Sequence, residues 1–75
     1  MDKTWYLKEA IEEFIKWKAS INKYPNPNRY QKTVITRHKN YCFAALWELL
    51  RKEKDESPSI SRVQYAFEIL EKYLT

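Results

Sequence analysis

The chain has 75 residues, a formal net charge of +4 and no glycine. This length allows one small domain, residues 1–75, and the lack of glycine argues against tight hairpins and glycine-rich phosphate loops. A single cysteine excludes an intrachain disulfide and favours an intracellular, cytoplasmic protein. Neither a signal peptide nor a stretch long enough to span a bilayer is apparent, so we expect no membrane partner.

The first helix is predicted over residues 4–21, followed by a connector of sequence NKYPNPN (residues 22–28). Apolar residues recur at helical spacing and predict a core face; they are Leu7, Ala10, Ile11, Phe14 and Ile15, with Lys18 at its end. The predicted exposed face carries charged side chains, namely Glu9, Glu12, Glu13 and Lys16. In the connector, two prolines interrupt helix formation, and Asn26 or Asn28 can cap the next helix.

The second helix is predicted over residues 29–54 and is the longest of the three. Its weak point is the sequence TVIT (residues 33–36), because β-branched residues lose rotamer freedom in a helix. We therefore expect that a bend or break can occur there.

The third helix is predicted over residues 59–73, with Ser57 or Ser59 as its cap. Its apolar face consists of residues at helical spacing, which are Ile60, Val63, Ala66, Phe67, Leu70 and Leu74. The chain is thus predicted to be all-α, a compact three-helix bundle with a long middle helix.

The only histidine and the only cysteine, His38 and Cys42, lie one helical turn apart. They share the predicted core stripe of the middle helix, whose other members are Val34, Tyr41, Ala45 and Leu49. A zinc site needs three or four ligands, and residues 14–47 supply no other His or Cys and no Asp or Glu. We interpret both residues as core residues, with a metal or redox role as the alternative, and we expect no cofactor.

Catalysis has no recognisable motif in this chain. The carboxylate pairs Glu12–Glu13 and Asp55–Glu56 are adjacent in sequence rather than spaced as an acid and a base across a cleft, and we interpret them as surface charge. The sequence therefore predicts a protein that is not an enzyme.

The positive charge is concentrated in residues 14–47, which contain seven Lys and Arg residues and no acid. Aromatic residues alternate with these cations. This composition is typical of surfaces that bind phosphates and bases. We predict that residues 16–40 bind nucleic acid, DNA more readily than RNA, with Thr33 available for sugar or base edges. The predicted contacts are Lys16, Lys23, Arg29, Lys32, Thr36, Arg37, Lys39 and Asn40.

Phe43 and Trp47 lie four residues apart on the same arc of the middle helix as several of these residues. Two interpretations are open: they meet another helix of the bundle, or they form an exposed patch for a protein partner or a second copy. The second interpretation is the alternative function, an interaction, inhibitor or accessory module of the kind found in mobile elements.

Two segments, YLKEAIEEFIKWKAS (residues 6–20) and NRYQKTVITRHKNYCFAALWELL (residues 28–50), resemble the N-terminal core-binding domain of tyrosine recombinases and phage integrases. Phe14 and Trp17 match the F-x-x-W element, and Tyr30, Tyr41 and Phe43 loosely match the spaced aromatics of its second helix. NPNRYQKT stands where the family commonly has a Ser/Thr-x-x-Thr turn. The resemblance implies a helical, SAM-like module that clamps DNA, here without the catalytic domain, and a phage or mobile-element origin.

Overall fold

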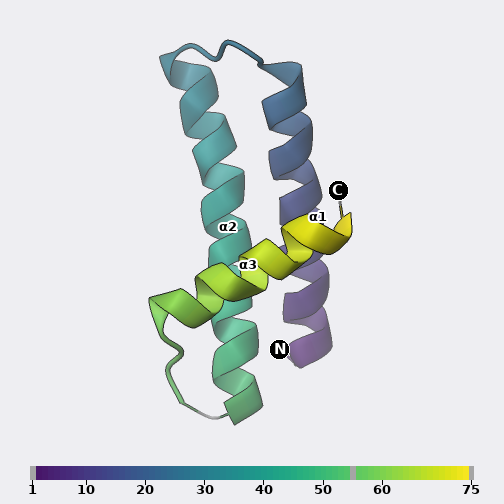
Figure 1. Cartoon of the computed structure of the whole chain (residues 1–75), viewed down its shortest axis with the longest axis vertical. Helices are drawn as coiled ribbons and strands as arrows, with labels where there is room; N and C mark the ends of the chain where they lie inside the picture. Colours follow the sequence, from purple (N-terminus) through teal and green to yellow (C-terminus); the bar gives the residue numbers. More distant parts are fainter. Residues whose placement is uncertain (1, 55, 75) are drawn as a thin grey trace.

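A computed structural model describes residues 2–54 and 56–74, which form three α-helices (Figure 1). They are α1 (Lys3–Lys23), α2 (Arg29–Lys54) and α3 (Ile60–Leu74). α1 and α2 run antiparallel side by side, and α3 crosses both of them obliquely (Figure 1). The all-α, three-helix prediction is confirmed, and each helix ends within two residues of its predicted limit.

Side chains cap the start of each helix. Asp2 Oδ1 accepts from the Trp5 amide at α1, and Ser59 Oγ accepts from the Arg62 amide at α3. At α2 the exchange is reciprocal, because Asn28 Oδ1 accepts from the Gln31 amide and Gln31 Oε1 accepts from the Asn28 amide. This is the geometry of a capping box, which satisfies two otherwise unpaired backbone donors.

α2 is continuous through residues 33–36, so the break that the β-branched sequence allows does not occur. Thr33 Oγ1 donates to the Arg29 carbonyl at 3.1 Å, a bond that helical threonine can make within the preceding turn. The predicted weak point is therefore a regular part of a 26-residue helix.

An aromatic cluster joins the three helices. The Phe67 ring of α3 lies 5.4 Å from Phe14 and 5.0 Å from Trp17 of α1, measured between centroids. The same ring is stacked on Phe43 of α2 at 4.8 Å. Rings at these separations attract one another beyond their burial of apolar area, so this cluster is the main link between α3 and the α1–α2 hairpin.

α1 faces the core through only part of the predicted set, of which Ala10 and Phe14 are buried. Its buried residues are Ala10, Glu13, Phe14 and Trp17. Leu7 and Ile15, expected in the core, are 43% and 57% exposed. The reason is the close approach of α1 and α2, which is made where both helices carry small residues, and Cys42 Sγ lies 3.3 Å from the Ala10 carbonyl oxygen.

Three further predicted core residues lie at the surface. Ile60 and Leu74 are exposed because they stand at the two ends of α3, and Tyr41 is exposed on α2. Across residues 2–54 and 56–74, no helix combines the length and apolar character needed to cross a membrane.

Candidate nucleic-acid interface

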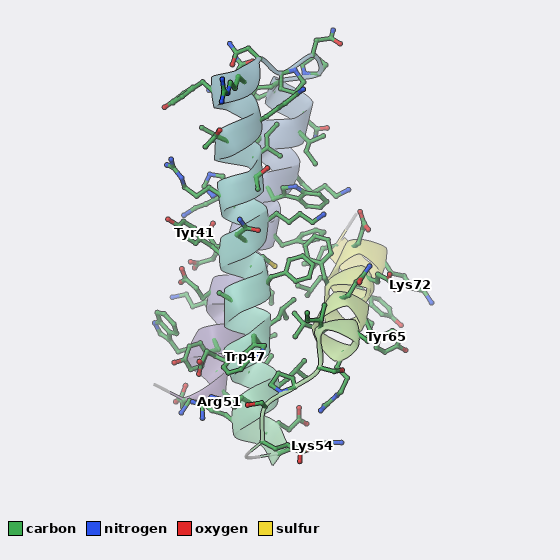
Figure 2. All side chains as sticks on the ribbon, turned by 90° about the vertical axis from the view of Figure 1, so that its left-hand side faces the viewer. Tyr41, Trp47, Arg51, Lys54, Tyr65 and Lys72 are labelled. Atoms are coloured by element: carbon green, nitrogen blue, oxygen red, sulfur yellow. The ribbon has the colours of Figure 1, made fainter. Side chains whose placement is uncertain are left out.

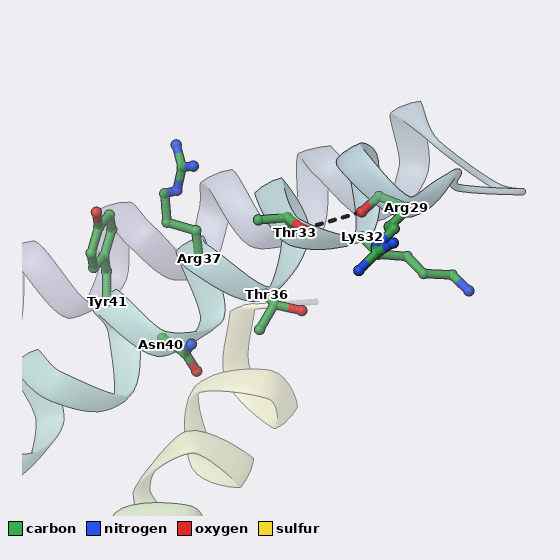
Figure 3. Close-up of a pocket in the computed structure, with 7 residues that line it drawn as sticks. All are labelled: Arg29, Lys32, Thr33, Thr36, Arg37, Asn40 and Tyr41. Atoms are coloured by element: carbon green, nitrogen blue, oxygen red, sulfur yellow. Dashed lines mark hydrogen bonds between the residues drawn. The ribbon is translucent and has the colours of Figure 1, made fainter.

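One exposed face of α2 forms a shallow groove along the N-terminal half of the helix (Figure 3). Its residues are spaced by alternating steps of three and one, so they lie on the same side of the helix. They are Arg29, Lys32, Thr33, Thr36, Arg37, Asn40 and Tyr41. Five of the eight predicted nucleic-acid contacts are thus brought together on one surface.

This surface, called here the α2 groove, is positively charged. Within the described part of the chain, no ion pair joins Arg29, Lys32 or Arg37 to a carboxylate. The first turn of α2 contains no acidic residue, although the positive end of the helix dipole favours one there. The cations and the helix dipole therefore act in the same direction, and both favour an anion from outside the chain.

The three other predicted lysines are positioned differently. Lys16 Nζ lies 3.6 Å from Glu13 Oε1, and Lys23 lies over the ring of Tyr24. Lys39 Nζ lies within 6 Å of the ring centroids of Trp17, Phe43 and Phe67 and so covers the aromatic cluster. These three ammonium groups already have partners within the chain and do not line the α2 groove.

α3 accounts for the position of Phe43. It crosses α2 below the groove, where Phe43 stacks on Phe67 and Trp47 packs against the core as a half-buried residue. Both side chains are half-buried and pack against the core, as in the interpretation in which they meet the rest of the bundle. Their use by a protein partner stays a prediction. The basic N-terminal half of the arc lines the groove, and its aromatic C-terminal half packs against the core.

Tyr41 belongs to the groove although the sequence placed it on the core stripe. It is 52% exposed, and Figure 3 shows it projecting from α2 in the same direction as Arg37. The available signal was its position one turn after Arg37, at the edge of the stripe rather than at its centre.

His38 and Cys42 face α1, as the core interpretation required. Glu13, predicted to be surface charge, is instead buried and lies 2.8 Å from His38, measured from Oε2 to Nδ1. Burial, with a smaller contribution from the Glu13 carboxylate, raises the pKa of Cys42 from 9.0 to about 12. A thiol held neutral and inaccessible in this way is a poor nucleophile and a poor metal ligand.

No group of three or more His, Cys, Asp or Glu side chains that could hold a metal ion occurs in the described ranges. Comparison of the chain with protein-family models, with curated proteins and with solved structures finds no match.

Proposed function

We propose that the protein is a small, non-enzymatic module that binds nucleic acid, DNA in the first instance, through the α2 groove. The observation that carries the proposal is the cluster of Arg29, Lys32 and Arg37 on one exposed face without an acidic partner among the described residues. A row of Lys and Arg side chains on one face is the electrostatic arrangement that neutralises the phosphates of a nucleic-acid backbone.

The polar residues between the cations support the same ligand class. Thr33, Thr36 and Asn40 lie within the groove, where short hydroxyl and amide side chains reach sugars and base edges. The resemblance of residues 6–20 and 28–50 to a DNA-clamping domain of tyrosine recombinases favours DNA over other polyanions.

The test is the salt dependence of binding to a fluorescein-labelled DNA 20-mer, as a duplex and as a single strand. Each phosphate contact makes the slope of log K against log salt concentration more negative by about 0.7–0.9, so three cations are expected to contribute about −2 to −3. The variant Arg29→Glu/Lys32→Glu/Arg37→Glu should lose this slope and nearly all affinity. Its fold should survive, because all three side chains are exposed and none of them forms an ion pair with the described residues.

A matched control is Lys3→Glu/Lys54→Glu/Lys72→Glu, which changes the formal charge equally but at exposed positions outside the groove. Lys39 is kept in both variants because it covers the aromatic cluster. If the two variants lose the same affinity, net charge rather than the groove is responsible. If the unmodified protein binds neither form of the DNA, the proposed function is wrong.

A further inference from the structure

A second groove adjoins the α2 groove and differs from it in chemistry. It lies between the N-terminal half of α1 and the middle of α2, and has a volume of about 240 Å³. Its lining is mainly aromatic and small, consisting of Trp5, Tyr6, Glu9, Tyr41, Ala44, Ala45 and Glu48. Tyr41 lines both grooves, so the basic surface and this aromatic groove are continuous.

Two rings of the aromatic groove are open to solvent. Trp5 is 41% exposed and Tyr41 is 52% exposed. The Trp5 indole is supported edge-on by Tyr6, with 5.1 Å between ring centroids. Figure 2 shows that Tyr41 projects away from α3, so neither the aromatic cluster nor α3 covers it.

Ring faces next to a row of cations match a polymer that carries both phosphates and planar bases. In a duplex, both faces of each base are already stacked on neighbouring pairs, and only an unpaired base can stack on a protein ring. We therefore infer that the protein binds single-stranded nucleic acid, with phosphates on Arg29, Lys32 and Arg37 and unpaired bases on Tyr41 and Trp5. This inference rests on the proposed function and specifies its ligand.

The two carboxylates of the aromatic groove fit this arrangement. They disfavour phosphates there, which keeps the backbone of the strand on the basic side of Tyr41. A carboxylate also accepts hydrogen bonds from the exocyclic amino groups of cytosine and adenine. Glu48 is held in place by Arg51, whose Nε and Nη2 lie 3.2 and 2.9 Å from Glu48 Oε2.

The experiment compares one labelled, mixed-sequence DNA 20-mer, alone and annealed to its complement, by fluorescence anisotropy. The single strand should bind more tightly than the duplex. Trp5→Ala and Tyr41→Ala should each weaken single-strand binding by about 5- to 150-fold, since one base–ring stack contributes about 1–3 kcal/mol. The salt slope should not change, because neither ring carries a charge.

Conservative and remote variants separate stacking from general damage. Trp5→Phe and Tyr41→Phe keep a ring and should retain most of the affinity. Tyr65→Ala removes an even more exposed ring on α3, outside both grooves, and should have no effect.

The outcomes also separate this inference from the proposed function. Binding that depends on salt and is lost on charge reversal would support the proposed function. If that binding is equal for both DNA forms and unchanged by Trp5→Ala and Tyr41→Ala, the single-strand inference alone is overturned. Failure of the unmodified protein to bind either form would overturn both.

Discussion

Glu13 and His38 form a partly buried contact between α1 and α2, with 2.8 Å between Oε2 and Nδ1. Glu13 is the buried charged residue of the core, and the His38 side chain is 23% exposed. A buried carboxylate without a hydrogen-bond donor is costly, so the position of His38 one turn before Cys42 is explained by Glu13.

Glu13→Ala is expected to reduce the free energy of unfolding by about 1–3 kcal/mol, because it leaves His38 without its partner at the helix interface. Glu13→Gln should cost less, since the amide can still form a hydrogen bond with the imidazole. Urea unfolding at neutral pH measures both, with Glu12→Ala as the exposed neighbouring control. In a double-mutant cycle, Glu13→Ala and His38→Ala should be coupled by at least about 0.5 kcal/mol, and strict additivity would contradict the contact.

Cys42 should make the fold sensitive to alkaline pH. Burial raises the pKa of the Cys42 thiol to about 12 in the folded protein, from 9.0 for an unburied thiol. Above pH 9 the unfolded chain therefore loses the thiol proton before the folded chain does. The stabilisation is complete below pH 9 and is lost as the pH rises toward 12.

The difference in unfolding free energy between the unmodified protein and Cys42→Ala should therefore shift by up to about 1.4 kcal/mol per pH unit above pH 9. Urea unfolding at pH 7.5, 9 and 10.5 measures this shift. Parallel pH profiles for the two proteins would show that the thiol ionises as readily in the folded state as in the unfolded state.

Phe67 should be the most sensitive residue of α3. It is buried and contacts rings from both other helices, so Phe67→Ala is expected to cost about 3–5 kcal/mol, a large part of the stability of a domain this small. Ile60→Ala, at an 84% exposed position of the same helix, should change stability by less than about 0.5 kcal/mol. Chemical denaturation monitored by circular dichroism distinguishes them, and equal effects would argue against the crossing position of α3.

The capping box of α2 gives a fourth prediction. Asn28→Ala should cost about 1 kcal/mol, because it leaves the Gln31 amide without its side-chain acceptor. Asn26→Ala is the matched control in the same connector and should be close to neutral. A larger effect at Asn26 would place the start of the helix elsewhere.

Most of the fold followed from local patterns in the sequence. Helix limits depend on caps and prolines that act within a few residues. The predicted limits therefore lie within two residues of the observed ones. The rotation of each helix about its axis was less predictable, because it depends on which neighbour the helix meets. The contact of Ala10 with Cys42 turned Glu13 inward and left Leu7 and Ile15 outside.

The candidate site shows the same division. Arg29, Lys32 and Arg37 lie on one face of α2, and helical periodicity alone brings them together. The packing of Lys39 and Phe43 depends on Phe67 of α3. The crossing position of α3 comes from contacts across more than 20 residues of chain and has no local signature in the sequence.

The basic residues of the α2 groove lie in a part of the molecule that has no buried side chains. None of residues 18–41 is buried, whereas the buried side chains of the described residues lie in residues 10–17 and 42–67. The tip of the hairpin can therefore open locally without disrupting the aromatic cluster, and its amide hydrogens should exchange faster than those around Leu46. A ligand bound along α2 would slow that exchange, so nucleic-acid binding would be visible as ordering of the hairpin tip even where the global stability changes little.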